Sequence, residues 1–465
     1  MLKMPSVFSD SMVLQRDKNI AVWGQSDSDF VTVELNGKTV EAKTNGGMWN
    51  LYLPPLHAGG PYKMTIKSGN DCITYNDIMI GEVWLAGGQS NMELELKDCK
   101  GGTEIVKNAS GDNVRFYYTP KVTSVGQELE EAESKSSWEK FIPNQCDKWS
   151  AVGYFFASML SEKLGVTVGV IGCNWGGTSA SCWISRKFLE YDIRIISYLK
   201  EYDNRDKSLE EAYNECPGSM HESMIKRVAP YTLAGFLYYQ GEEDDHKPYT
   251  YYELLLTLVR QWRYDWKDDK LPFMLVQLPI YQEEGEPDYK NWPFIREAQM
   301  KLYDTVKNTG IAVILETGEY NNIHPVDKKT VGKRLMLQAM YHVYGDIDEK
   351  EAYGPIYDSY FVENGIMYIK FKYVETGIIC NTEEECGFEI AGADKKYYPA
   401  KAVILGDSIA LSSDKVNIPL YARYFWTNYH KVSLFGANGI PVAPFRTSTD
   451  DGAICTGSRN TGLFK

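Results

Sequence analysis

The chain lacks an excess of positive charge and has no long hydrophobic run. Its 465 residues include 49 Lys and Arg against 63 Asp and Glu, a formal net charge of −14. An acidic chain does not attract nucleic acid or anionic lipid, so neither partner is expected. No run of about 18 apolar residues predicts a membrane span. The first residues, MLKMPSVFSD, lack the apolar segment of a signal peptide, and a cytoplasmic location is expected.

Metal-binding cysteine patterns are also missing. The nine cysteines are odd in number and include no Cys-x-x-Cys pair. Neither a zinc knuckle nor a thioredoxin-like motif is therefore predicted, and reduced, mostly buried thiols are expected. No metal is expected.

The composition is that of a soluble globular protein with large cores. Hydrophobic residues make up 43% and charged residues 24%. The pattern of apolar residues changes twice along the chain. We predict a β region at 1–78, an α/β domain at 79–345 and a second β region at 346–465.

The two β regions consist of short alternating segments separated by turn residues. In the first region, ELNGKTV contains Asn36-Gly37, a dipeptide that supplies the positive φ angles of a type I′ hairpin turn. The second region contains MYIKFKYV, CGFEIAG, KAVILGDSIALSS and YARYFWTN. We expect the first region to form a small sandwich or sheet layer, and the second to form either a separate module or one that packs against the N-terminal sheet.

The central region alternates apolar strands with helical patterns. The expected strands are 82–87, 114–119, 166–172, 233–239, 273–278 and 311–316. Continuous apolar runs are typical of strands covered on both faces, so a doubly wound parallel α/β sheet is predicted. The helix in SAVGYFFASMLSEKLG is expected to begin after Ser150 as N-cap and to end at Gly165.

A lone serine follows the first of these strands. The segment EVWLAGGQSNMELEL (82–96) is apolar up to Gly87-Gly88 and then presents Ser90. Ligands bind outside the carboxyl ends of parallel strands, and a helix N-terminus there offers N–H groups to an oxyanion. Ser90 therefore suits a nucleophile, although the same position also suits a simple N-cap. The sequence is not the Gly-x-Ser-x-Gly elbow of α/β-hydrolases.

A serine nucleophile needs a base, and the chain has only six histidines. Of these, His324 follows the strand at 311–316, at the sheet edge where Ser90 is expected. Pro325 favours extended backbone at His324. Two further loops at this edge offer hydrogen-bond donors: Gly176-Gly177 after the strand 166–172, and Gln240 after the strand 233–239.

Four motifs together resemble the sialate O-acetylesterase family of SGNH hydrolases. They are GQSNM (88–92), NWGGTSASCW (174–183), YYQGEE (238–243) and NNIHP (321–325). Segments near both ends of the chain are also similar, so the resemblance spans most of it. It implies a flavodoxin-like α/β domain with attached β regions, and removal of O-acetyl groups from sugars without a cofactor.

The resemblance also implies roles for single residues. Ser90 matches the nucleophile and His324 the base, whereas Gly177, Gln240 and the Ser90 N–H match the oxyanion donors. The family usually carries an Asp two or three residues before the histidine, but here those positions are Asn322 and Asn321. Glu319 is the nearest acid. Either Glu319 or a main-chain carbonyl is expected to orient the imidazole.

Substrate contacts are expected at the same edge. Trp175, Trp183 and Tyr239 offer apolar faces to a sugar ring. The alternative role for each of these rings is packing in the core or at its rim. Glu242 lies in QGEEDD, where the family commonly has Gln-Gly-Glu-Ser-Asn, so specificity is expected to differ. A sialic acid carries a carboxylate, which a bidentate arginine recognises. Arg296, in WPFIREAQ, and Arg186 are the candidates, each also suited to a structural ion pair.

Three functions remain open from the sequence. The first is an esterase for O-acetylated sialic acids, and the second is the same chemistry on a neutral sugar such as an acetylated xylo-oligosaccharide. The third is a non-catalytic carbohydrate-binding protein, favoured only by the missing acid before His324. The sequence does not specify an oligomeric state.

Overall fold

The computed structural model describes residues 1–111, 113–143, 145–204, 213–381 and 386–457. The chain forms two compact units. Unit 1 comprises Met1–Gln240 and Leu256–Phe273, and unit 2 comprises Gly241–Leu255 and Met274–Lys465. The domain limits expected from the sequence stay a prediction. Among the described residues, no helix has the length and apolar character needed to cross a membrane.

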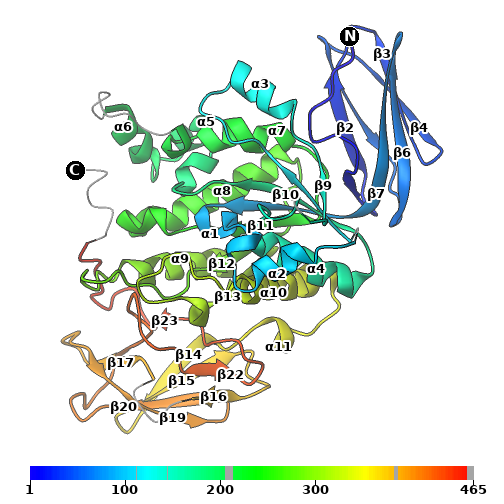
Figure 1. Ribbon diagram of the computed structural model, residues 1–465. Coiled ribbons are helices and arrows are strands. Elements are labelled where there is room, and N and C mark those ends of the chain that lie inside the picture. Colours follow the sequence, from blue (N-terminus) through cyan, green and yellow to red (C-terminus); the bar gives the residue numbers. More distant parts are fainter. Residues whose placement is uncertain (112, 144, 205–212, 382–385, 458–465) are drawn as a thin grey trace. The chain divides into compact units, whose positions relative to one another are not determined.

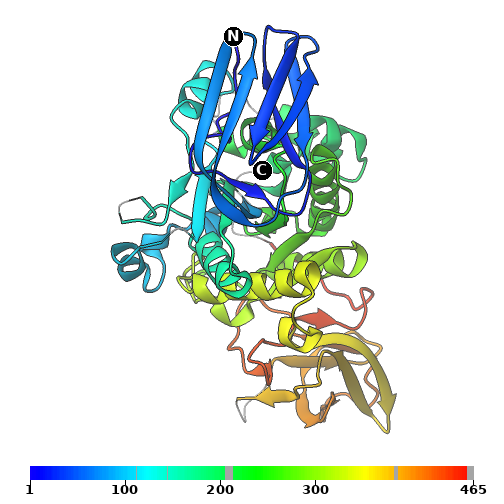
Figure 2. The same cartoon turned by 90° about the vertical axis from the view of Figure 1, so that its right-hand side faces the viewer.

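The N-terminal part of unit 1 is built from β-strands, drawn in blue in Figure 2. The predicted hairpin is confirmed: Asn36 has φ 47° and Gly37 has φ 72° between its two strands. The strands are β1 (Val13–Gln15), β2 (Ile20–Gln25), β3 (Phe30–Leu35), β4 (Lys38–Lys43), β5 (Met48–Leu53) and β6 (Gly59–Ser68).

Strand β7 (Asp71–Gly88) joins this β layer to the central sheet of unit 1. Its first half pairs antiparallel with β6, and its second half pairs parallel with the strands of the α/β core. Arg115 is buried beside it and donates to the carbonyl oxygen of Asp77 at 2.6 Å and to that of Ser11 at 2.9 Å. β7 therefore passes through the boundary expected near residue 78.

The parallel sheet predicted for the central region is confirmed. In unit 1 its order is β11-β7-β10-β8-β9, with β8 (Val114–Tyr118), β9 (Glu139–Lys140), β10 (Val168–Asn174) and β11 (Gly235–Tyr239). β8, β10, β7 and β11 are mutually parallel, and only β9 is antiparallel.

Helices cover both faces of β7. Trp84 meets Phe156 of α4 (Ala151–Leu164) with ring centroids 5.1 Å apart, whereas Gly87 faces Trp262 of α8 (Tyr251–Asp265). Residues 84 and 87 differ in parity and so point to opposite faces of the strand. The sheet is thus doubly wound.

The predicted caps of α4 are also confirmed. Ser150 accepts a hydrogen bond from the Gly153 N–H at 3.0 Å, and Gly165 ends the helix with φ 66°. The other helices that lie wholly in unit 1 are α1 (Ser90–Glu93), α2 (Gly102–Lys107), α3 (Gln127–Glu133), α5 (Arg186–Tyr191), α6 (Ile196–Asn204) and α7 (Lys226–Val228).

Unit 2 continues the α/β pattern and then turns to β structure. β12 (Phe273–Gln277), which begins at the unit boundary, is adjacent to β13 (Thr309–Val313). The helices of unit 2 are α9 (Asn291–Thr305), α10 (Lys328–Ala339), which continues as a π-helical turn (Met340–Tyr344), and α11 (Glu349–Ala352). The unit boundary also falls within α8.

The C-terminal strands of unit 2 form three antiparallel sheets, drawn from yellow to red in Figure 1. Their order is β14-β15-β20-β19, β18-β17-β21-β23 and β16-β22. A common core of Met367, Ile369, Ile390, Ile409 and Leu411 is fully buried. The strands are β14 (Ile356–Glu363), β15 (Ile366–Lys372), β16 (Ile378–Cys380), β17 (Phe388–Ala391), β18 (Tyr398–Pro399), β19 (Lys401–Leu405), β20 (Ser408–Ser412), β21 (Tyr421–Tyr424), β22 (Leu434–Gly436) and β23 (Phe445–Arg446).

Candidate active site

The two glycines that end β7 allow close packing at the carboxyl edge of the sheet. A Cβ atom on Gly87 would lie 2.5 Å from the Trp262 ring, and one on Gly88 would lie 2.1 Å from the carbonyl oxygen of Tyr239. Gly88 also has φ +136°, which disfavours any side chain. Only glycine therefore lets the end of β7 lie this close to the end of β11, immediately before Ser90.

Ser90 is the first residue of the short helix α1 and is half-buried. The Gln89 N–H before it donates to the Tyr239 carbonyl oxygen at 3.1 Å. The loop after β10 lies directly against the serine, because a Cβ atom on Gly176 would be 3.3 Å from the Ser90 Cβ. The structure thus brings together Ser90 and the glycine loop, as the sequence predicted.

Glu93 holds this glycine loop in place. One carboxylate oxygen of Glu93 accepts the Gly176 N–H at 2.6 Å, and the other pairs with Lys121. The Lys121 ammonium group also lies 5.5 Å from the centroid of the Trp175 ring. Gly177, the next residue, has φ +71°. The peptide between Trp175 and Gly176 is therefore anchored to the helix that carries Ser90.

Gln240 is buried and links a third loop to the same place. Its side-chain amide donates to the Thr178 carbonyl oxygen at 3.1 Å and accepts from the Tyr238 hydroxyl at 3.3 Å. An amide NH₂ group carries two N–H donors, and the contact with Thr178 engages one of them. The role of Gln240 as an oxyanion donor stays a prediction.

His324 lies in unit 2, in a loop between β13 and α10, and is exposed. Its main-chain N–H donates to the side-chain oxygen of Asn322 at 3.1 Å. The buried Pro325 follows, and Asp327 then caps α10 by accepting from the Thr330 N–H at 3.1 Å. The loop thus leads from His324 directly into α10.

Glu319 organises the loop that carries His324. Its carboxylate accepts from the Asn322 side chain at 2.8 Å and from the Val326 N–H at 3.1 Å. The two contacts close the loop on either side of the histidine. Asn322, which stands where the family usually has an acid, thus connects Glu319 to the His324 main chain. The identity of the group that orients the imidazole ring stays a prediction.

The residues expected to contact the sugar differ in exposure. Trp183 is fully buried and donates from its indole to the Thr178 hydroxyl at 2.9 Å. Tyr239 is fully buried too, and Glu242 of unit 2 is almost so. Burial of Trp183 and Tyr239 favours packing roles for them. Trp175 is half-buried and retains an exposed surface for a ligand.

Neither candidate arginine presents an open guanidinium group. Arg296 is fully buried in α9 and donates to the Thr427 carbonyl oxygen at 2.6 Å. Burial lowers the pKa of Arg296 to about 9, against the opposing charge of Asp288. The Nη2 group of Arg186 donates to both carboxylate oxygens of Asp203, at 3.0 and 2.9 Å. Among the described residues, no cluster of His, Cys, Asp or Glu is placed to hold a metal ion.

Comparison with known proteins gives a consistent result. The sequence model of the family described as "Carbohydrate esterase, sialic acid-specific acetylesterase" matches residues 80–339. That is more than half of the chain. The chain belongs to this carbohydrate esterase family. It is therefore a carboxylic ester hydrolase, as the motifs predicted.

Individual members of the esterase family cover most of the chain. Sialate O-acetylesterase of Homo sapiens is 26% identical over 95% of this chain and 92% of its own length. The enzyme of Mus musculus is 27% identical over 74% of each chain. The crystal structure of a carbohydrate acetylesterase from Xanthomonas citri matches with a TM-score of 0.86 and 31% identity, over 97% of this chain and all of that one.

Two residues of this esterase were not singled out from its sequence. Glu93 follows Ser90 by three residues, and this spacing places both side chains on one side of a helical turn. The spacing could therefore have identified Glu93 as a neighbour of Ser90. Asn322 was noticed only as the replacement of an acid. Its contacts with Glu319 and His324 depend on the turn of the loop, which local sequence patterns do not specify.

Proposed function

We propose that the protein hydrolyses O-acetyl esters of sugars, with Ser90 as nucleophile and His324 as base. The observation that carries the proposal is the contact between Ser90 and the glycine loop, which Glu93 anchors. Backbone N–H groups held beside a nucleophile stabilise the negative charge that develops on the carbonyl oxygen. Membership of the esterase family supports the same chemistry.

The reaction proceeds in two steps, acetylation of Ser90 and hydrolysis of the acetyl-enzyme. The Ser90 hydroxyl attacks the acetyl carbonyl carbon while His324 accepts its proton, and the Ser90 N–H, Gly177 and Gln240 hold the oxyanion. The sugar leaves with the proton from His324, which leaves an acetyl ester on Ser90. Water then attacks this ester with His324 again as base, and acetate and free serine result.

O-acetylated sialic acids are the first candidate substrates. The description of the matching family and the names of its mouse and human members support them. A specific site for these substrates needs a positive group for the sialic carboxylate.

Neutral acetylated sugars are the second candidate substrates. The support for them is the state of the two candidate arginines: Arg186 is paired with Asp203, and Arg296 is buried against main-chain carbonyl oxygens. The net charge of −14 also gives an anionic sugar no long-range attraction.

A substrate panel tests the proposal. Acetate release is measured with O-acetylated sialic acid, acetylated xylo-oligosaccharides and a chromogenic acetate ester, in the wild type and in Arg296→Lys and Arg186→Ala. Release from at least one sugar supports the function. A preference for the sialate that vanishes in one arginine variant assigns the first candidate. Equal rates on both sugars in every variant assign the second, and no acetate release from any sugar contradicts the proposal.

A further inference from the structure

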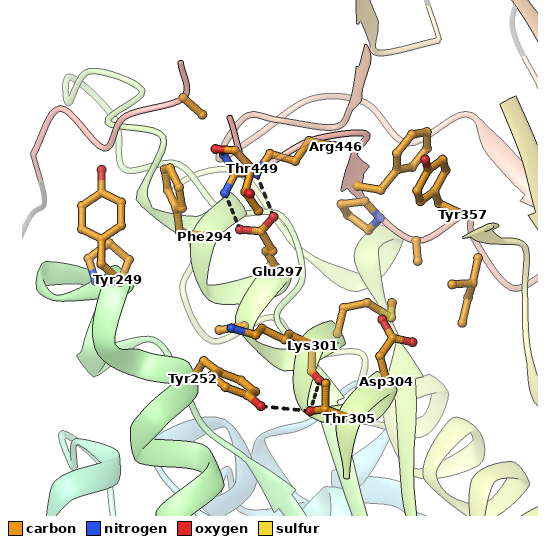
Figure 3. Close-up of a pocket in the computed structure, with 18 of the residues that line it drawn as sticks. Tyr249, Tyr252, Phe294, Glu297, Lys301, Asp304, Thr305, Tyr357, Arg446 and Thr449 are labelled. Carbon is orange, nitrogen blue, oxygen red and sulfur yellow. Dashed lines mark hydrogen bonds and ion pairs between the residues drawn. The ribbon is translucent and has the colours of Figure 1, made fainter. Parts of the chain in front are cut away.

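Unit 2 contains a large cavity whose lining includes none of the residues assigned to ester chemistry. Its volume is about 660 Å³, within the range of small-molecule binding sites. Figure 3 shows its walls, which come from the start of α8, from α9, from β14 and from residues 443–453.

One wall carries an exposed aromatic ring that is held in place. Tyr249 is 60% exposed, yet its hydroxyl accepts a hydrogen bond from the Cys455 N–H at 2.7 Å. Its ring also meets the ring of Phe294 edge-on, with centroids 4.9 Å apart. An exposed side chain fixed in this way loses little conformational freedom when a ligand binds.

Two more tyrosines of the cavity are fixed by neighbouring side chains. Tyr357 stacks on Phe445, with centroids 4.6 Å apart and ring planes within 9°. The Tyr252 hydroxyl makes a hydrogen bond of 3.0 Å to Thr305, and the Lys301 ammonium group lies 3.9 Å from the Tyr252 ring centroid. Aromatic rings and hydroxyl groups thus both line the cavity (Figure 3).

The charged groups of the cavity are not arranged to bind an anion. Arg446 is held by Glu297 through two contacts of 2.8 Å and by Asp451 at 3.0 Å. Lys301, the other cation among the described lining residues, lies over the Tyr252 ring. Glu253 and Asp304 add negative charge to the walls.

The same carboxylates suit a ligand with many hydroxyl groups. Each carboxylate accepts several hydrogen bonds, and Thr449 adds a hydroxyl group that can both donate and accept. Partial burial raises the pKa of Asp304, against the charge of Lys372. An uncharged hydroxyl ligand meets no repulsion here, whereas a sialic carboxylate would face Glu253 and Asp304.

We propose that this cavity binds a neutral saccharide, as a second carbohydrate site on the esterase. The proposal rests on the proposed function, since it takes the ligand to be part of the carbohydrate that carries the acetyl groups. The apolar faces of sugar rings would pack on Tyr249 and Tyr357, and their hydroxyl groups would reach Asp304 and Thr449.

Binding is tested by isothermal titration calorimetry on full-length protein carrying Ser90→Ala, so that no ester is consumed. The probes are unacetylated xylohexaose, cellohexaose and mannohexaose, with sialyllactose as the anionic comparison. We expect at least one neutral probe to bind more tightly than sialyllactose. When Tyr249→Ala or Asp304→Asn is introduced into the Ser90→Ala protein, the Kd of that neutral probe should rise about tenfold or more. An effect of this size is typical of central binding residues.

Tyr52→Ala is the matched control, because Tyr52 is 49% exposed on β5 and lies outside the cavity. It should leave Kd unchanged. In protein that retains Ser90, the substitutions Tyr249→Ala and Asp304→Asn should leave the turnover of a small chromogenic acetate unchanged. Failure of all three neutral probes to bind overturns the site, and so does a Kd that neither cavity variant changes. If sialyllactose binds more tightly than every neutral probe, the proposed preference of the cavity for neutral saccharides is overturned.

The outcomes separate this site from the proposed function. Loss of saccharide binding in the cavity variants supports the site even if the wild type releases no acetate from any sugar. Acetate release combined with binding that is indifferent to Tyr249 and Asp304 supports the esterase and removes the second site.

Discussion

The segment around Ser90 and the segment around His324 differ in how they are held. Residues 83–92 are buried except for the half-buried Ser90, and Gly87 and Gly88 have no room for a Cβ atom. By contrast, His324 and Val326 are exposed, and the hydrogen bonds of their loop run to neighbours in sequence and, through Asn321, to residues 282–284. The first segment is packed inside unit 1, whereas the second is exposed and is tied to another loop of unit 2.

This difference suits the different tasks that we propose for the two segments. A nucleophile and its oxyanion donors must hold a fixed geometry, because stabilisation of the transition state depends on preorganised donors. A base needs only to reach the nucleophile and to keep its tautomer, which a short local network can provide. Substitutions around Ser90 should therefore affect both folding and kcat, and those around His324 mainly kcat.

The largest effect is expected from Ser90→Ala. Removal of the nucleophile should lower kcat on a chromogenic acetate by about 10⁶-fold, the loss seen when one member of a serine hydrolase site is removed. Because Ser90 is only half-buried, the substitution should leave the fold intact, and circular dichroism checks this. Ser158→Ala, in α4, is the matched control. A Ser90→Ala variant with near-wild-type turnover would exclude Ser90 as nucleophile.

His324→Ala should lower kcat by about 10⁴-fold or more, because the serine then has no general base. Its Tm should stay close to that of the wild type, since the histidine is exposed. His57→Ala, at another exposed histidine, serves as control and should retain full activity. A normal kcat for His324→Ala at neutral pH would assign the base to another residue.

Gln240→Ala should lower kcat by about 10²-fold through loss of one oxyanion donor. It should also lower Tm, because the buried amide bonds to Thr178. Steady-state kinetics and thermal melts measure the two effects separately. A raised KM with unchanged kcat would show that Gln240 contacts substrate instead of the oxyanion.

Glu93→Ala should lower kcat by about 10–10²-fold by releasing the glycine loop beside Ser90, since small misplacements cost this much. Glu93→Gln keeps an acceptor for the Gly176 N–H and should restore most of the rate. Glu95→Ala, which removes a surface pair with Lys97, is the control and should be silent. Equal losses in Glu93→Ala and Glu93→Gln would show that charge, not loop position, is what matters.

The smallest effect is expected from Glu319→Gln. Its contacts lie with Asn322 and Val326, and a glutamine retains one acceptor for them, so we expect a loss of a few-fold, far below that of His324→Ala. Glu284→Gln, which contacts Asn321 in the same loop, is the control. A loss near 10⁴-fold would instead make Glu319 the acid of a full triad.

Local patterns predicted much of this molecule. Continuous apolar runs located the parallel strands, Ser150 and Gly165 marked the ends of α4, and Asn36-Gly37 marked the hairpin. Each of these features depends on residues close together in sequence.

Features that depend on residues far apart in the sequence could not be predicted. The position of β10 between β7 and β8 depends on how the crossovers pack, and no apolar period encodes it. Arg296 was considered as a clamp because an arginine signals charge recognition, but its burial follows from packing against residues 427–428, more than a hundred positions away. The Glu93–Gly176 contact joins a helix and a loop that are 83 positions apart in sequence.

Covalent labelling of the intact protein with an organophosphonate tests the role of Ser90 most directly. Such reagents phosphonylate a serine that is activated by a neighbouring base and served by an oxyanion site. Peptide mass spectrometry should find one adduct, on Ser90, which is absent in Ser90→Ala and forms far more slowly in His324→Ala. An adduct on a different residue, or equal labelling of the wild type and His324→Ala, would contradict the assignment of Ser90 and His324 as nucleophile and base.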